Sequence, residues 1–289
     1  MKYNLRNYQK QASDAAVRLF TSKADTNGLV ILPTGAGKSL VIADIASRLE
    51  GPLLVFQPSK EILQQNFAKL QSYGIFDCGC YSASVRCKDI NRITFATIGS
   101  VMNHMSDFDC FKNIIIDECH YVNSMSGQYK QFIEAKNRQV VGLTATPYRL
   151  DRAEGGSILK FLTRVRPRIF SKVIYCCQIG ELLSKGYLAD LHYYDLTELD
   201  LRRVRSNSTG ADYDERSLLA EYERCGFYDK LSNTVVKVLQ PKSGIPRKGV
   251  LVFTAFTKEA RQLVDKLQSL RINAAIVTGE TPKKEREAI

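Results

Sequence analysis

A chain of 289 residues is long enough for two domains, because a globular domain usually takes roughly 100–200 residues. The 44% apolar and 25% charged residues are typical of a globular protein, and no apolar run approaches the roughly 18–20 residues of a membrane span. The first residues lack the apolar core of a signal peptide, which together with eight scattered cysteines predicts a reducing, cytoplasmic setting. A net charge of +11 suggests a polyanionic partner, although a basic excess is also common on solvated surfaces.

The first predicted elements are a helix and a buried strand. Apolar residues recur at helical spacing from Tyr8 to Phe20. The apolar run from Leu29 to Leu32 then predicts a strand of a parallel sheet, and it ends at Pro33, which cannot donate to a sheet ladder. A second helical pattern, SLVIADIASRL, follows after the short segment TGAGK.

That short segment has the composition of a phosphate-binding loop. Gly35 and Gly37 allow a turn whose amides point inward, and the start of the next helix adds unpaired amides. Lys38 would reach the β- and γ-phosphates, and the Ser39 hydroxyl would ligate Mg²⁺. The GxxxxGK[ST] pattern has Gly where this chain has Leu32. The alternative is a Gly-rich turn with a surface lysine, but the order of strand, loop and helix favours nucleotide binding.

Four further apolar runs predict strands, and each is followed by a polar cluster. The runs are residues 53–57, 93–96, 113–116 and 139–143. Ser59 is placed to cap a helix from Glu61 to Tyr73. Because ligands bind at the carboxyl ends of parallel strands, the polar clusters predict one shared site in a protein of the α/β class.

The acidic pair Asp117-Glu118 directly follows one of these runs. Beside a P-loop, one carboxylate holds the Mg²⁺ that bridges the phosphates, and the next orients or deprotonates the attacking water. Two acids at a strand end would mean little alone, but the P-loop earlier in the chain favours this role.

The remaining chain predicts a connector and part of a second α/β unit. Residues 150–170 are basic and irregular. A long helix is expected at about Glu215 to Leu239 and a shorter one from Lys258 to Leu270. Only two strands are expected here, Gly249–Phe253 and Ala274–Val277.

Taken together, the motifs resemble those of superfamily-two helicases. LPTGAGKS, IIIDECH and GLTATPYR resemble motifs I, II and III. LRNYQKQA is similar to the Q motif, PSKEIL to motif Ia, ATIGS to motif Ib, and LVFTAFTKEA with VTGETP to motif IV and the segment after it. The match runs from Leu5 to the last residue, and within the superfamily the chain most resembles bacterial RadD-like repair helicases, with restriction-type helicase subunits close behind.

The resemblance implies two RecA-like parallel-sheet P-loop domains. The expected boundaries are residues 1–150 for the first domain, 151–171 for a connector and 172–289 for a partial second domain. The family's TxxxGxD-like element and its QxxGRxxR element, which carries the arginine finger, have no match after Thr278, so the second domain is expected to be truncated. The resemblance also implies ATP and Mg²⁺ as cofactors and a nucleic-acid partner, DNA rather than RNA, with no membrane and with a protein partner left open.

The resemblance further implies a role for each matching residue. The nucleotide would be bound by Arg6, Gln9, Pro33, Thr34, Gly35, Ala36, Gly37, Lys38 and Ser39, with Gln9 and Arg6 recognising adenine. The catalytic residues would be Lys38, Asp117, Glu118 and His120, and Ser39 and Asp117 would hold Mg²⁺. Thr144 and Thr146 would join His120 in coupling the nucleotide state to nucleic acid. One strand's phosphate backbone would be followed by Pro58, Ser59, Lys60, Thr97, Gly99, Ser100 and Thr278, without sequence specificity.

Three functional hypotheses follow from these patterns. The first is an ATP-dependent helicase or translocase acting on DNA. The second is a nucleotide- and nucleic-acid-binding module without appreciable turnover. It follows from the missing match to the element with the arginine finger, since such a finger can contribute a factor of ~10³–10⁵ to turnover. The third is an RNA helicase, since contacts to the phosphate backbone suit both nucleic acids.

Overall fold

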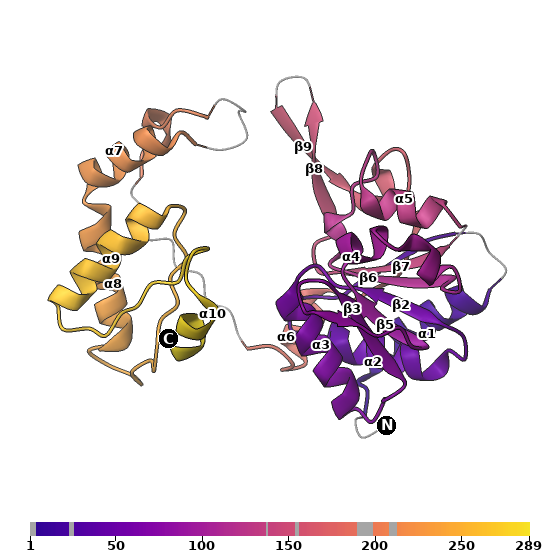
Figure 1. The fold of residues 1–289 in the computed structure, drawn as a ribbon. Coiled ribbons are helices and arrows are strands. Elements are labelled where there is room, and N and C mark those ends of the chain that lie inside the picture. The colour runs from indigo at the N-terminus through magenta and orange to yellow at the C-terminus, as the bar shows by residue number, and fades with distance from the viewer. Residues whose placement is uncertain (1–3, 23–25, 137, 154–155, 190–198, 208–212) are drawn as a thin grey trace. The chain divides into compact units, whose positions relative to one another are not determined.

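The computed structural model describes residues 4–22, 26–136, 138–153, 156–189, 199–207 and 213–289 (Figure 1). The chain divides into two compact units. The first comprises residues 1–153 and 157–192, and the second comprises residues 193–289 with 154–156. None of the described helices is long and apolar enough to cross a membrane.

The first unit is built on an eight-stranded sheet in the order β10-β1-β7-β6-β2-β5-β3-β4. All neighbouring strands are parallel except β3 and β4. The strands are β1 (Gly28–Ile31), β2 (Leu53–Phe56), β3 (Cys78–Ser82), β4 (Cys87–Lys88), β5 (Ile93–Ala96), β6 (Asn113–Asp117), β7 (Gln139–Thr144) and β10 (Lys172–Cys176). The five predicted strands are present, so the α/β prediction is confirmed.

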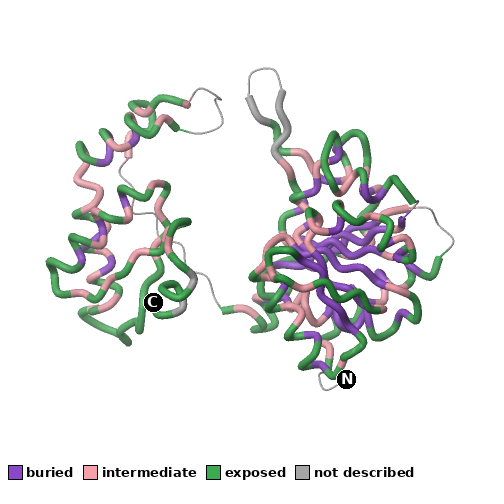
Figure 2. Tube along the Cα trace, in the orientation of Figure 1, coloured by how far each residue is buried: buried purple, intermediate pink, exposed green. Residues whose placement is uncertain are grey.

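Helices cover both faces of this sheet (Figure 1). One face carries α1 (Asn7–Thr21), α2 (Lys38–Arg48) and α3 (Lys60–Ser72), and the other carries α4 (Ile98–Met102), η1 (Met105–Phe108), η2 (Cys119–Tyr121) and α5 (Gln128–Glu134). Because successive strand residues point to opposite faces, Val30 packs in one apolar cluster and Leu29 in the other. Figure 2 shows the strands as the buried centre of the unit.

The carboxyl ends of the strands gather the motifs. The P-loop follows β1, the acidic pair lies at the end of β6, and the TATP segment follows β7. These three strands are neighbours in the sheet, and β2 and β5 come next on the β6 side. Helix α3 begins as predicted, because the Ser59 hydroxyl accepts a hydrogen bond from the Ile62 amide at 3.3 Å.

The segment from Lys172 differs from the predicted domain boundary. It forms strand β10, which pairs in parallel with β1 at the edge of the first sheet, and α6 (Ile179–Ser184) follows in the same unit. Ile174 packs closely on Gly28, where an added Cβ would lie 2.7 Å from its Cγ2. The predicted connector also contains regular structure, since β8 (Tyr148–Ala153) and β9 (Gly156–Phe161) form a two-stranded sheet before η3 (Leu162–Arg164).

The second unit is helical in its described residues. Its elements are η4 (Leu201–Arg203), α7 (Glu215–Cys225), α8 (Phe227–Leu239), α9 (Thr257–Ser269) and α10 (Lys283–Ala288). The single long helix predicted from Glu215 to Leu239 is wrong, because Gly226 divides it with φ of +64°, a value outside the right-handed helical range.

The two strands predicted in this unit are also not formed. Residues 249–253 and 274–277 are described, and neither segment belongs to a strand. Val252 and Ala274 pack against a small cluster from α8 and α9, whereas Leu251 and Phe253 are 80% and 88% exposed. A parallel strand needs hydrogen-bonded neighbours, and the described residues after 199 offer no sheet to join. The assignment of this unit to a partial RecA-like domain therefore stays a prediction.

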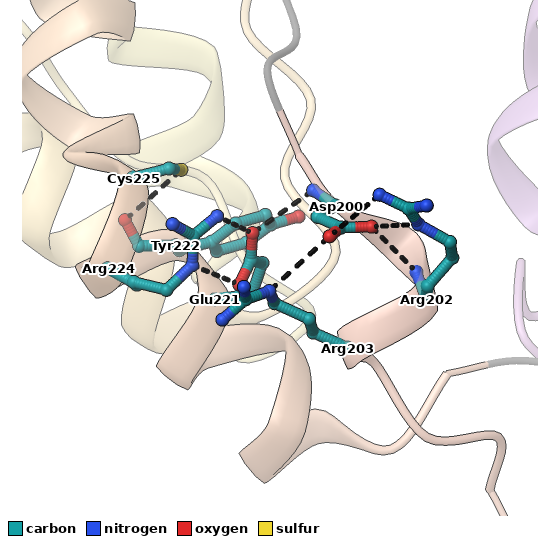
Figure 3. A network of polar contacts seen from close by, with 7 residues as sticks. All are labelled: Asp200, Arg202, Arg203, Glu221, Tyr222, Arg224 and Cys225. Atoms are coloured by element: carbon teal, nitrogen blue, oxygen red, sulfur yellow. Dashed lines mark hydrogen bonds and ion pairs between the residues drawn. The ribbon is translucent and has the colours of Figure 1, made fainter.

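A polar network ties the start of the second unit to α7 (Figure 3). The Asp200 amide donates to Glu221 Oε1 at 3.0 Å, and Arg224 Nε donates to Glu221 Oε2 at 2.7 Å. Asp200 in turn accepts hydrogen bonds from the guanidinium groups of Arg202 and Arg203. The hydrogen bond from Arg224 is the main cause that lowers the pKa of Glu221 to about 2, so this carboxylate is charged at neutral pH.

Candidate nucleotide-binding site

The loop between β1 and α2 has the backbone that phosphate binding requires. Gly35 and Gly37 have φ of +80° and +81°, in the left-handed region that favours glycine. A side chain at Gly37 would also meet Gln9 Nε2 at 2.7 Å. Helix α2 begins at Lys38, so the amides of Lys38 and Ser39 have no acceptor within the helix, whereas the Leu40 amide donates to the Gly37 carbonyl oxygen at 3.0 Å. The loop and the positive end of the helix together form an anion-binding site.

The predicted adenine-recognition segment holds this loop from α1. The Tyr8 hydroxyl and Gln9 Nε2 both donate to the Ala36 carbonyl oxygen at 2.9 Å. Gln9 Oε1 accepts a hydrogen bond from the Arg6 amide at 2.9 Å. Gln9 is buried, and its side-chain amide holds the P-loop in position through the Ala36 carbonyl oxygen. The adenine contact of Gln9 and Arg6 stays a prediction.

Three of the predicted catalytic side chains lie in contact. Lys38 Nζ is 2.8 Å from Glu118 Oε1, and His120 Nδ1 is 3.4 Å from Glu118 Oε2. Glu118 has φ of +50°, which is uncommon for a residue with a side chain and recurs at functional sites. The structure thus joins the P-loop to the acidic motif through one ion pair.

A second set of contacts joins the acidic motif to the segment after β7. His120 Nδ1 lies 2.9 Å from the Thr144 hydroxyl and 3.3 Å from the Thr146 hydroxyl. The Thr146 amide also donates to Thr144 Oγ1 at 3.1 Å. His120 therefore connects Glu118 to the end of β7.

Asn66 is a site residue that the sequence did not single out. It lies on α3, and its Oδ1 accepts a hydrogen bond from the Ser39 hydroxyl at 2.7 Å. Its Nδ2 donates to Asp117 Oδ2 at 3.3 Å and to Gln57 Oε1 at 3.1 Å. One amide therefore bridges the two side chains predicted to hold Mg²⁺. No local pattern marks it, because its partners are 27 and 51 residues away.

The donor set around Asn66 fits a magnesium ion. Ser39 and Asp117 supply a hydroxyl and a carboxylate oxygen. In nucleotide sites Mg²⁺ takes such oxygen ligands from the protein together with phosphate and water oxygens. Asp117 is 4% exposed, and burial, with the charge of Glu118, raises its pKa to about 6. A buried carboxylate with a raised pKa gains from a nearby cation, which favours its charged form.

The predicted nucleic-acid residues of the first unit lie at the ends of β2 and β5. Pro58, Ser59 and Lys60 follow β2, and all three are partly exposed. After β5, the Thr97 and Ser100 hydroxyls lie 3.0 Å apart. The list of predicted residues also contains Gly99, which is exposed, and Thr278, which lies in the second unit and accepts a hydrogen bond from the Glu280 amide.

Thr97 and Ser100 are already tied to the end of β3. Thr97 Oγ1 lies 3.0 Å from the Ser82 hydroxyl, and Ser100 Oγ accepts a hydrogen bond from the Ala83 amide at 2.9 Å. These contacts fix the turn that would face a phosphate backbone.

The comparisons with known proteins agree with this arrangement. Residues 2–149, which cover β1 to β7 and every motif of the first sheet, match the family model described as Type III restriction enzyme, res subunit. The chain belongs to this family. The resemblance to superfamily-two helicases is thereby confirmed for the first unit.

Two curated relatives match nearly the whole chain. The DNA 3'-5' translocase XPB2 of Sulfurisphaera tokodaii is 24% identical over 100% of this chain and 67% of its own length. The DNA 3'-5' helicase XPB of Kineococcus radiotolerans is 27% identical over 95% of this chain and 48% of its own length. The chain therefore spans about half to two thirds of these relatives. Among solved structures, the Type ISP restriction-modification enzyme LlaGI has a TM-score of 0.49 at 17% identity, over 64% of this chain and 18% of that one.

Proposed function

We propose that this family member is the ATP-hydrolysing part of a cytoplasmic DNA helicase or translocase. The observation that carries the proposal is the continuous set of contacts from Lys38 through Glu118 and His120 to Thr144. Lysine and acid side chains at a P-loop serve phosphoryl transfer, and the histidine and threonine give the nucleotide site a connection to the rest of the sheet.

Glu118 is the side chain best placed to act on the attacking water. Its carboxylate lies beside Lys38, and ATP would draw the ammonium group of Lys38 to its phosphates. Glu118 would then be released to accept a proton from water as the water attacks the γ-phosphorus and the β–γ bridging bond breaks. When bound by Ser39 and Asp117, Mg²⁺ would neutralise charge on the phosphate oxygens.

His120 supports the coupling of ATP to nucleic acid. It contacts both Glu118 and Thr144, so a change in the Glu118 contacts would alter the hydrogen bonds between His120 and the threonines. The predicted backbone-binding residues of the first unit lie farther along the same edge, after β2 and β5. The net charge of +11 suits a polyanionic partner, and the names of both relatives, which specify DNA, support DNA over RNA.

A binding module without turnover is the second candidate. The observation that favours it is that residues 250–253 and 274–277 belong to no strand, so the described residues of the second unit contain no sheet.

Steady-state phosphate release separates the two candidates. The motor predicts Mg²⁺-dependent release that single-stranded DNA stimulates and Lys38→Ala abolishes. Tight ATP binding without release, with or without DNA, would refute the motor and support the binding module. Stimulation by a matched RNA strand but not by DNA would refute the assignment of the partner.

A further inference from the structure

One aromatic side chain reaches the nucleotide site from beyond β10. Helix α6 ends at a glycine turn in which Gly186 has φ of +64°. The Gly186 amide donates to the Leu183 carbonyl oxygen at 2.9 Å. The next amide, that of Tyr187, donates to the Leu182 carbonyl oxygen at 2.8 Å. This pair of hydrogen bonds is the Schellman arrangement, which closes a helix and fixes the residues that follow.

Tyr187 and the residue after it lie beside helix α1 and the P-loop. Its ring centroid is 6.0 Å from that of Tyr8, the residue whose hydroxyl binds the Ala36 carbonyl oxygen. The following residue, Leu188, touches the loop itself, because an added Cβ at Gly35 would lie 3.2 Å from Leu188 Cδ2. The Tyr187 ring thus lies beside α1, and the next side chain, that of Leu188, lies against the phosphate-binding loop.

A guanidinium group covers one face of the Tyr187 ring. The Cζ atom of Arg6 lies 3.9 Å from the ring centroid, and Arg6 is exposed. Tyr187 itself is 39% exposed. A guanidinium on an exposed side chain can leave at small cost, whereas packed core atoms could not.

We infer that Tyr187 is a stacking residue for the base of the bound nucleoside triphosphate. The inference rests on the proposed nucleotide site. The base would take the place that the Arg6 guanidinium has on the ring, with the phosphates on the amides of the P-loop. Stacking on an aromatic ring strengthens binding of any base, so Tyr187 would add affinity without selecting the base.

The competing explanation gives Tyr187 a purely structural role. In that case its ring would hold Tyr8 and Leu188 against the loop, and its loss would weaken binding of phosphates as much as binding of a nucleoside. Inorganic tripolyphosphate, which has the phosphate chain but no base, distinguishes the two.

Calorimetric titration of the full chain with Mg²⁺ and either ATP or tripolyphosphate tests the inference. For Tyr187→Ala we expect the Kd for ATP to rise about ten-fold, the size expected for loss of one stacking contact. The Kd for tripolyphosphate should not change. Tyr187→Phe keeps the ring and should bind both ligands as the parent chain does.

Phe76→Ala provides a matched control for loss of an exposed aromatic ring. Phe76 is 75% exposed and precedes β3, at the amino edge of the sheet, so neither affinity should change. An unchanged ATP affinity in Tyr187→Ala would overturn the inference, and so would an equal loss for both ligands. A parent chain that binds neither ligand would refute the proposed function itself.

Discussion

Glu118 contacts two side chains, one through each oxygen of its carboxylate. Oε1 is paired with Lys38 and Oε2 faces His120. ATP bound as proposed would compete with Glu118 for the ammonium group of Lys38. Under the proposed function, Glu118 would therefore be the residue through which ATP binding changes the other contacts of the site.

Glu118→Gln should leave ATP binding close to that of the parent chain and slow hydrolysis by roughly 10²–10⁴-fold, because an amide keeps the shape but cannot accept a proton. Calorimetry gives the affinity and single-turnover phosphate release gives the rate. Equal losses of binding and turnover would show that Glu118 serves the structure of the site instead.

Asn66→Ala should raise the Mg²⁺ concentration needed for half-maximal ATP binding by roughly ten-fold, because the variant no longer orients Ser39 and Asp117 toward each other. A Mg²⁺ titration of ATP binding measures this. Gln65→Ala is the control, since it removes an exposed amide from the same helix. The same Mg²⁺ requirement in both variants would contradict the bridging role.

At the level of elements, the sequence predicted those strands that have a clear local pattern of apolar residues. The buried strands β1, β2, β5, β6 and β7 were predictable because each is an apolar run bounded by polar residues. Strand β3, with the sequence CGCYS, is fully buried but contains few strongly apolar residues, so it gave no signal. Strand β10 was visible as apolar residues, but its partner β1 lies far earlier in the chain. Long-range pairing of this kind has no local pattern.

The same reasoning explains the errors in the second unit and the missed site residues. Residues 250–253 have the composition of a strand, but a strand forms only beside another. Gly226 was absorbed into a helical pattern because one glycine does not disturb periodicity. Asn66 and Tyr187 became visible only through contacts with residues distant in the sequence.

Acid should loosen the link between residue 200 and α7. The pKa of Glu221 is lowered from 4.5 to about 2, chiefly by the hydrogen bond from Arg224. A carboxyl group whose pKa is lower in the folded chain contributes stability that is complete above its unfolded pKa and is lost as the pH falls through its folded pKa. Protonation between pH 4.5 and 2 should therefore weaken the hydrogen bond from the Asp200 amide.

Amide exchange at Asp200, corrected for the intrinsic effect of pH, measures this loss. Glu221→Ala removes the acceptor and should show fast exchange already at neutral pH, whereas Glu223→Ala, which removes an exposed acid from the same helix, should behave as the parent chain does. Protection of Asp200 that is the same at pH 7 and pH 2 would contradict the proposed link.

For the whole molecule, the two units differ in how their apolar segments are covered. The first unit has a sheet buried on both faces by two apolar clusters. The second has a cluster with three buried members and exposed apolar residues at 251 and 253. Local stability follows buried contacts and paired backbone groups, so the first unit should be the more stable.

Hydrogen exchange along the chain should therefore be faster across residues 250–277 than across β1 and β6, where strand amides are paired and buried. Mass spectrometry of peptides from both segments measures the difference. Equal protection in a monomeric chain would mean that the second unit is as stable as the first.

The nucleotide and nucleic-acid sites should be coupled, and the affinity of Glu118→Gln for single-stranded DNA measures this coupling. This variant should hold ATP without hydrolysing it, so its Kd for DNA can be measured with and without Mg²⁺ and ATP. We predict a change of about 5–150-fold, matched by an equal effect of DNA on the affinity for ATP, because coupling between binding sites is reciprocal. Thr144→Ala in the same background should reduce the change while leaving ATP binding intact, since it removes the hydroxyl that contacts His120. The same DNA affinity with and without ATP would show that the two sites are not coupled.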